Sequence, residues 1–145
     1  MNWWHIFRDE REKLAYPRPK LISFDGCERI TIRDVTLINS PSWTVNPIRC
    51  HDVTIDNVSI INPADSPNTD GIDPESCKNV RISNCHIDVG DDCIAIKAGT
   101  EDTSERVSCE NITITNCTMF HGHGAVVFGS EMSGDIRNVT ISNCT

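Results

Sequence analysis

Leucine, methionine and positive charge are scarce in this sequence. Its 145 residues include three Leu and three Met against 18 Ile and ten Val, and β-branched side chains favour strands over helices. No apolar run approaches the roughly 18 residues of a membrane span. Lys and Arg number 13 against 21 Asp and Glu, which gives a net charge of −8. These shortages argue against an all-helical fold, an integral membrane protein and a nucleic-acid-binding protein, which needs a basic surface.

The remaining composition is that of one folded domain. Hydrophobic residues make up 38% of the chain and charged residues 23%, as is ordinary for a globular protein. We therefore expect residues 1–145 to form a single domain. The first ten residues contain no cationic segment followed by an apolar one, so no secretory signal is visible.

A short pattern recurs five times along the chain. Each copy alternates apolar and polar residues and carries Asp or Asn at its fifth position. The copies begin at Ile30, Val53, Val80, Ile112 and Val139. Their spacings of 23, 27, 32 and 27 residues indicate a solenoid whose coils share strands while the loops between them vary in length.

The pattern within each copy predicts a strand, a corner and a second strand. An alternation of period two is typical of a strand with one buried face. The fifth positions hold residue types that tolerate a left-handed backbone, namely Asp34, Asn57, Asn84, Asn116 and Asn143. Stacked coils of this kind form an all-β parallel β-helix, here of about five coils, with the Asn side chains in a ladder at the ~4.8 Å strand spacing.

The eight cysteines fit the same stacking. Side chains stacked in parallel at ~4.8 Å exceed the ~3.8 Å Cβ separation of a disulfide. We therefore expect buried free thiols rather than a disulfide framework or a zinc site. Two sets share equivalent positions: Cys27, Cys50, Cys77 and Cys109 before the repeats, and Cys85, Cys117 and Cys144 at an inward position within them.

The repeat also aligns a column of polar residues. Trp43 and Asp70 each lie seven residues before a cysteine that precedes a repeat, and the segments that begin at Asp92 and His123 match the one that begins at Asp70. We expect these four residues to stack on a third sheet, with Asp91 beside them. Two lengthened loops are expected to wall a cleft around the column, Asn62–Thr69 and Ala98–Ser108.

Stacked carboxylates suit acid and base catalysis. Carboxylates at ~4.8 Å repel one another, which raises the pKa of at least one and leaves one protonated and one ionised near neutral pH. Glycosidic cleavage needs such a pair, an acid for the leaving oxygen and a base for the attacking water. The other reading is that each Asp accepts backbone N–H bonds in a turn. Adjacent strand residues point to opposite faces, so Asp91 reaches the cleft of Asp92 only through a bend or bulge.

Other members of the column have structural readings as well. His123 is either part of the chemistry or a packed histidine. His121 and His123 suggest a metal site only weakly, because no third ligand follows at metal-binding spacing. Trp43 is either a core residue or a platform for sugar stacking.

Three segments, in this order, resemble the pectin-degrading polygalacturonases of glycoside hydrolase family 28. They are Asn68-Thr-Asp-Gly-Ile-Asp, Gly90-Asp-Asp-Cys-Ile-Ala-Ile-Lys and Gly122-His-Gly. Three more resemble its exo-acting or bacterial and plant-type branch: Arg18-Pro-Lys-Leu-Ile-Ser-Phe, Ser40-Pro-Ser-Trp-Thr and Gly129-Ser-Glu-Met-Ser-Gly. The resemblance covers nearly the whole chain. It implies a right-handed parallel β-helix and inverting hydrolysis of α-1,4-galacturonosyl linkages.

The resemblance also implies roles for the column. Asp91 corresponds to the general acid, Asp70 and Asp92 to the pair that activates water, and His123 to a supporting histidine. An inverting enzyme is expected to hold its acid ~6.5–9.5 Å from its base. Lys97 and His121 are the remaining basic residues near the column, and with Trp43 they are our candidates for substrate binding. Neither a cofactor nor a metal ion is implied.

One motif of the family is missing. Its Arg-Ile-Lys segment, which binds the substrate carboxylate, should follow the last repeat, and the sequence stops at Thr145. The terminal coils of a solenoid also need polar caps. We therefore expect the β-helix to be incomplete at its carboxyl end and residues 1–145 alone to be inactive. The complete protein is expected to be monomeric, and the family is typically secreted or held in the cell envelope.

Two other functions fit a carbohydrate-acting solenoid. A β-helical pectate lyase uses acidic residues to hold Ca²⁺ and a basic residue to remove a proton. A non-catalytic, adhesin-like solenoid binds oligosaccharides without turning them over. The expected partner of the hydrolase is a polysaccharide, galacturonan or pectin, with no nucleic acid and no membrane.

Overall fold

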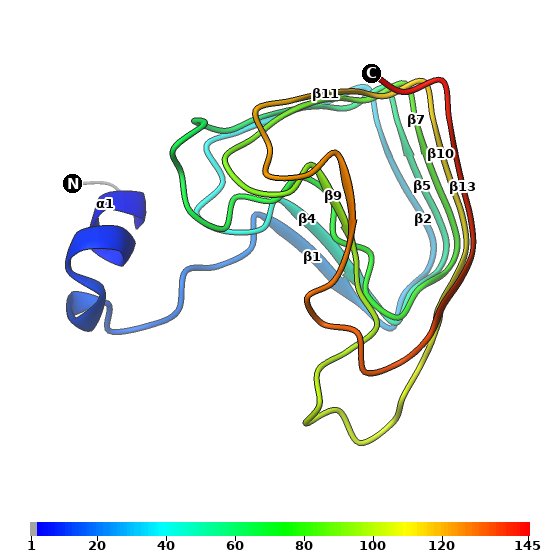
Figure 1. The fold of residues 1–145 in the computed structure, drawn as a ribbon, viewed down its shortest axis with the longest axis horizontal. Coiled ribbons are helices and arrows are strands. Elements are labelled where there is room, and N and C mark those ends of the chain that lie inside the picture. The colour runs from blue at the N-terminus through cyan, green and yellow to red at the C-terminus, as the bar shows by residue number, and fades with distance from the viewer. Residues whose placement is uncertain (1–2) are drawn as a thin grey trace.

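The structure, a computed structural model, describes residues 3–145 as a short helical arm followed by a stack of strands (Figure 1). The arm contains α1 (Trp3–Asp9) and the 3₁₀ helix η1 (Arg11–Lys13). The strands are β1 (Ile22–Asp25), β2 (Glu28–Arg33), β3 (Thr36–Ile38), β4 (Val45–Ile48), β5 (His51–Asp56), β6 (Ser59–Ile61), β7 (Lys78–Ser83), β8 (His86–Asp88), β9 (Ile94–Ile96), β10 (Cys109–Thr115), β11 (Thr118–Phe120), β12 (Val126–Phe128) and β13 (Ile136–Ser142).

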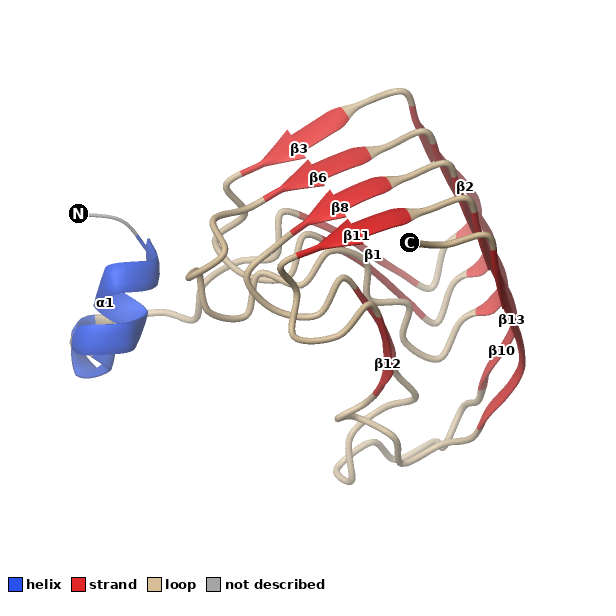
Figure 2. Cartoon of the chain, turned by 45° about the horizontal axis from the view of Figure 1, so that its top comes forward, coloured by secondary structure: helices blue, strands red, loops and turns tan. Residues whose placement is uncertain are grey.

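The strands form the faces of a parallel β-helix. One sheet has the order β13-β10-β7-β5-β2 and a second the order β11-β8-β6-β3, and Figure 2 shows the strands of the second sheet stacked one above another. The third face consists of the pairs β1-β4 and β9-β12. Bridges through Ile72 and Glu75 connect these two pairs into one continuous face. All pairs are parallel, which confirms the expected fold class.

The number of coils is smaller than the number of repeats. Five strands lie on the first sheet and four on the second, so the chain makes about four turns rather than five. The expectation of about five coils counted each repeat as a full coil. Five strands stacked on one face enclose only four complete circuits of the chain.

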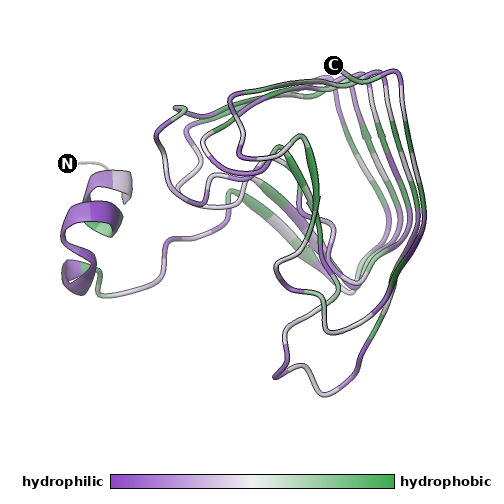
Figure 3. Cartoon of the chain, in the orientation of Figure 1, coloured by the Kyte–Doolittle hydropathy of each residue, from purple (hydrophilic) through white to green (hydrophobic). Residues whose placement is uncertain are grey.

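The alternating Ile and Val residues build the core. Ile30, Val53, Val80, Ile112 and Val139 pair in register across the first sheet. The three in the middle of the stack are 0–1% exposed, and Figure 3 shows hydrophobic positions recurring along the strands of successive coils. Burying each such side chain contributes roughly 1.5–3 kcal/mol to stability, so the stack itself holds the site in place.

The expected corners are left-handed. Asp34, Asn57, Asn84, Asn116 and Asn143 have φ between 53° and 57°. Their ladder is interrupted, because Asn84 donates to Asp56 (2.8 Å) rather than to Asn57. A second, unexpected series of left-handed residues runs through the first sheet, comprising Arg29, Asp52, Asn79, Asn111 and Asn138.

All eight cysteines are free thiols, as expected, but only six are buried, because Cys27 and Cys144 lie on the end coils and are half-exposed. Cys50, Cys77 and Cys109 are fully buried and stack so that the backbone N–H of one lies 3.4 Å from the Sγ of the next. Burial raises the pKa of Cys109 to about 11, which keeps this thiol protonated. In residues 3–145, no helix is both long and apolar enough to cross a membrane.

Candidate active site

Trp43, Asp70 and Asp92 lie on successive coils of the third face. The N–H of Thr44 donates to the carbonyl oxygen of Asp70 (2.8 Å), and the N–H of Gly71 donates to that of Asp92 (2.9 Å). The bridges of Ile72 to Val45 and to Ile94 fix the same register. These contacts confirm the column for its first three members.

His123 lies one residue away from its expected place. Since Ile94 pairs with Val126, the residue that follows Asp92 in the column is Gly124. His123 stacks instead on Asp91, with its N–H 3.2 Å from the Asp91 carbonyl oxygen. The alignment of His123 with Asp92 was therefore wrong by one residue. The physical reason is that Gly122 and Gly124 carry no side chain that would mark the register on either side of His123.

Asp91 reaches the same side of the molecule as Asp92 through a bend. Gly90 and Asp91 lie in bends between β8 and β9. This confirms the bend that is required for Asp91 to face the same side as the adjacent Asp92. The N–H of Asn68 donates to Asp91 Oδ2 (3.1 Å), and the N–H of Asp92 donates to Oδ1 (3.0 Å). His123 Nδ1 lies 3.3 Å from Oδ1. Three groups thus fix the orientation of one carboxyl group.

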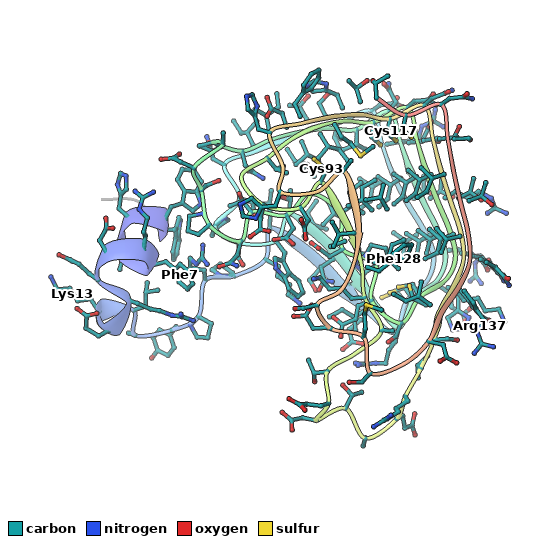
Figure 4. All side chains as sticks on the ribbon, viewed as in Figure 1. Phe7, Lys13, Cys93, Cys117, Phe128 and Arg137 are labelled. Carbon is teal, nitrogen blue, oxygen red and sulfur yellow. The ribbon has the colours of Figure 1, made fainter. Side chains whose placement is uncertain are left out.

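The three Asp residues open into one groove of about 420 Å³. The loop Asn62–Thr69 contributes Asn68 to its wall, as expected. A further part of the lining comes from β12, which carries Phe128 (Figure 4), and from the segment after it. The lining residues are Trp43, Asn68, Asp70, Asp91, Asp92, Lys97, Val127, Phe128, Ser130 and Glu131.

The loop Ala98–Ser108 does not line this groove, contrary to expectation. The N–H of Gly134 donates to Ala98 O (2.7 Å) and that of Ser133 to Gly99 O (3.0 Å). Residues 130–133 therefore pack against the start of this loop. Thr100 and Glu101 line a separate cavity of about 360 Å³.

Two carboxyl groups of the column have raised pKa values. Burial, and secondarily the charge of Asp91, raises the pKa of Asp70 to about 7. The same two causes raise the pKa of Asp92, which is more exposed. Both groups therefore hold protons more strongly than an ordinary carboxyl group, but burial, rather than repulsion between the stacked carboxylates, is the main cause.

A fourth Asp lies directly behind the groove. Asp73 is 0% exposed, and neither of its side-chain oxygens has a hydrogen-bond partner among the described residues. Burial and the nearby Asp70 raise its pKa well above the usual range. Asp73 therefore holds a proton more strongly than an ordinary carboxyl group.

Lys97 is buried beneath the groove and engaged by protein groups. Its Nζ donates to Gly129 O (2.9 Å) and to Glu131 Oε2 (2.8 Å) and lies 4.5 Å from the centre of the Trp43 ring. Burial alone would lower the pKa of Lys97, but Glu131, Asp73 and Asp70 more than offset it and raise that pKa. The cation is therefore retained.

Trp43 is half-buried and lines the groove, so it is not a core residue. Besides Lys97, Lys20 places its Nζ 4.6 Å from the centre of the indole ring. Cations at this distance are attracted by the ring quadrupole. Sugar stacking on Trp43 stays a prediction, and the two lysines are already in contact with the ring.

His121 is not part of the groove. Its Nδ1 lies 2.7 Å from Asp88 Oδ1, and its side chain is 62% exposed. The backbone of His121 is left-handed, with φ of 55°. His121 directly follows β11, which pairs with β8, the strand that contains Asp88. The structure therefore does not bring His121 together with the other candidates for substrate binding.

One group of residues is compact enough to hold a cation within residues 3–145. Asp91, Asp92 and His123 each offer a ligand atom within 4.8 Å of the others. His121 does not join it, so the structure does not assemble a metal site from the two histidines. The same closeness contradicts the expected ~6.5–9.5 Å between Asp91 and its base, at least for Asp92. Because these residues are consecutive, their carboxyl groups cannot separate widely within one bend.

Sequence reasoning missed four residues here. Phe128, Ser130 and Glu131 line the groove but follow a long, irregular loop that gives no register. Asp73 is fully buried at a position held by Ala95 on the next coil. It belongs to the same Asn68-Thr-Asp-Gly-Ile-Asp segment as Asp70, and its acidic side chain was the available signal.

Substituting Gly90 by Ala is expected to destabilise the protein and to disturb the groove. A Cβ at Gly90 would lie 2.3 Å from Ser66 O and 2.6 Å from Pro63 O, and these backbone atoms cannot move aside without shifting the loop. The expected loss is roughly 1–3 kcal/mol of unfolding free energy, measured by thermal or denaturant unfolding. Gly26→Ala is the control, because nothing lies within 4 Å of its Cβ and only its left-handed φ of 63° is strained. A loss of less than about 0.5 kcal/mol in Gly90→Ala would show that the close packing at Gly90 is unimportant.

The chain is similar in sequence to proteins that are named as polygalacturonases. The chain is 41% identical over 140 residues to a probable polygalacturonase from Vitis vinifera, which covers 94% of this chain and 28% of the relative. It is 36% identical over 144 residues to an endo-polygalacturonase from Pectobacterium carotovorum subsp. carotovorum, covering 99% of this chain and 34% of the relative. The chain thus spans about a third of the length of these relatives.

Solved structures agree with the sequence relatives. The hyperthermoactive exopolygalacturonase from Thermotoga maritima superposes with a TM-score of 0.85 at 40% identity, over 91% of this chain and 30% of that one. The polygalacturonase from Erwinia carotovora ssp. carotovora gives 0.86 at 36% identity, over 98% and 36%. The family model for glycosyl hydrolases family 28 matches residues 1–145. The chain therefore belongs to glycosyl hydrolases family 28.

Proposed function

We propose that the protein is a polygalacturonase, which hydrolyses the α-1,4-galacturonosyl linkages of pectin. The observation that carries the proposal is that Asp70, Asp91 and Asp92 open into one groove, with His123 against Asp91. Such a set supplies both an acid and a base for glycosidic cleavage. Relatives named as polygalacturonases support the substrate class.

Asp91 acts as the general acid in this proposal. The N–H groups of Asn68 and Asp92 orient its two oxygens, so its carboxyl group has a fixed direction into the groove. His123 contacts Asp91 while its own side chain is 72% exposed. The imidazole is therefore placed to return a proton from solvent to Asp91 after each cleavage.

Asp70 and Asp92 together activate the attacking water. They lie on neighbouring coils, and the pKa of each is raised by burial and by Asp91. A carboxylate whose pKa is raised accepts a proton more readily than an ordinary carboxylate. We infer an inverted product from the family resemblance, because the closeness of Asp91 and Asp92 does not itself indicate the stereochemistry.

A galacturonan carries a carboxylate on each sugar, so its binding calls for cations. Lys97 is the only Lys or Arg among the described residues that line the groove, and Glu131 already binds it. A substrate carboxylate at this position must therefore replace Glu131 or share Lys97 with it. The indole ring of Trp43 lies against the ammonium group of Lys97 and lines the groove beside it.

The test is the product spectrum of polygalacturonate treated with the whole protein. We expect new reducing ends without the ultraviolet absorbance of an unsaturated sugar, and proton NMR early in the reaction should detect the inverted anomer. Absorbance from an unsaturated product would identify a lyase instead. Binding of oligogalacturonate with no turnover would identify a non-catalytic solenoid. A retained anomer would indicate a covalent intermediate and a different role for Asp70.

A further inference from the structure

Arg18 connects three separate stretches of the chain. It lies in the extended segment before β1 and is half-buried. Its guanidinium donates to Pro41 O (2.9 Å), to Pro67 O (2.7 Å) and to the Asn68 side-chain oxygen (2.7 Å). One side chain therefore joins the loop that precedes Trp43 to the loop that precedes Asp70.

The helical arm covers this arginine. The ring of Phe7 in α1 lies 3.7 Å from Arg18 Cζ, and Figure 4 shows Phe7 on the side of α1 that faces the coils. Trp4 fixes the same arm, because its indole N–H donates to Ser40 O (2.9 Å). Such a stack holds the guanidinium in one plane and partly excludes water from it.

Asn68 connects Arg18 with Asp91. Its side-chain oxygen accepts from Arg18, and its backbone N–H donates to Asp91 Oδ2 (3.1 Å). The residue is left-handed, with φ of 55°, and Pro67 before it is held by the same guanidinium. The direction of the Asn68 N–H therefore depends on contacts that Arg18 makes.

We propose that Arg18 is a positioning residue for the groove, which acts through Asn68 to hold the carboxyl group of Asp91, and that α1 keeps Arg18 in place through Phe7. The proposal rests on the proposed function for its effect on turnover, although its structural part stands separately. It gives the helical arm a role at a site that it does not line.

Arginine suits this role better than lysine. The three acceptors belong to two loops, and a planar guanidinium presents five N–H donors in fixed directions. An ammonium group carries the same charge as a compact point with three donors. Arg18→Lys thus retains the charge and removes the shape, which separates geometry from electrostatics.

The experiment combines kinetics with hydrogen exchange in the whole protein. We expect Arg18→Lys to lower kcat on polygalacturonate roughly 10- to 100-fold, because a misplaced catalytic group is costly, with KM changed by less than about threefold, because Arg18 does not line the groove. We also expect the Asn68 amide to exchange faster, while the amides of β5 and β7 exchange as before. Phe7→Ala should shift both readouts in the same direction, by less.

Arg33→Lys is the matched control. Arg33 is an exposed arginine at the end of β2 that pairs with Asp34, so both readouts should match those of the unsubstituted protein. If Arg18→Lys does not fold, Phe7→Ala carries the test, because it leaves every hydrogen-bond partner of Arg18 in place. Unchanged kcat and unchanged Asn68 exchange in the folded variants would overturn the proposal. If the unsubstituted protein does not cleave polygalacturonate, the proposed function fails, and faster Asn68 exchange still supports the positioning contact.

Discussion

Replacing Asp91 by Asn is expected to lower the turnover of polygalacturonate roughly 10²–10⁴-fold. The amide has nearly the shape of the carboxyl group, and its oxygen can still accept one of the two backbone N–H groups that Asp91 binds, from Asn68 or from Asp92. Its NH2 group then faces the other donor, which costs about 1–3 kcal/mol of stability. The amide cannot deliver a proton to the leaving glycosidic oxygen. The protein should therefore lose rate while its fold and its affinity for oligogalacturonate are retained.

The measurement is kcat from reducing-sugar release, together with the midpoint of thermal unfolding. Asp88→Asn is the matched control, since Asp88 lies on the same coil and pairs with exposed His121 outside the groove. That variant should turn over substrate at nearly the original rate. Turnover of Asp91→Asn within about threefold of the original would remove Asp91 from the role of acid. The chemistry would then have to be reassigned among Asp70, Asp92 and His123.

The fold could be predicted from the sequence because its signal is repeated. Five copies of one alternating pattern fix both the strands and their register, and each copy repeats the evidence of the last. Asp70 and Asp92 were placed correctly for this reason, since Ile72 and Ile94 lie two residues after them and mark the inward direction. In this part of the molecule, local pattern and stacking indicate the same structure.

The site was less predictable where the repeat is interrupted. Residues 98–108 lengthen one coil, and after this loop Gly122 and Gly124 offer no side chain that marks a register, so His123 was placed one residue too far along. The walls of the groove depend on how loops pack on each other, which no repeat determines. Arg18 was visible only as part of a motif, because its contacts reach residues that lie 23 to 50 positions further along the chain.

The position of the helical arm also depends on long-range contacts rather than on a local sequence pattern. Its seven-residue helix is too short to be stable alone, and nothing in its sequence indicates what it covers. Contacts from Trp4 to Ser40 and from Phe7 to Arg18 determine its place. The place of such a segment follows from long-range packing, which a local sequence pattern does not predict.

Replacing Asp70 by Asn is expected to abolish most activity and to change how stability depends on pH. Asp70 is 4% exposed, and its Oδ1 has no hydrogen-bond partner among the described residues. Burial, followed by the charge of Asp91, raises its pKa from 3.8 to about 7. Between about pH 4 and pH 7 the folded protein therefore retains a proton that the unfolded chain releases.

The sign of the effect follows from this difference in proton binding. Where the folded state binds more protons, the free energy of unfolding falls as the pH rises. The original protein should thus lose stability from about pH 4 to pH 7, by up to roughly 4 kcal/mol if Asp70 acts alone. Asp70→Asn cannot ionise and should lack this loss. Its amide also buries new N–H donors, which costs about 1–3 kcal/mol at every pH.

The informative quantity is therefore the change in the stability difference with pH, not its value at one pH. Unfolding of Asp70→Asn and of the original protein should be compared from pH 4 to pH 8, with Asp102→Asn as a control at an exposed carboxylate in a loop. We expect the variant to gain stability relative to the original protein as the pH rises, while the control shows no such trend. A constant difference across this range would mean that Asp70 is ionised throughout. The base of the proposed mechanism would then be an ordinary carboxylate, held in its charged state by contacts other than those described for Asp70.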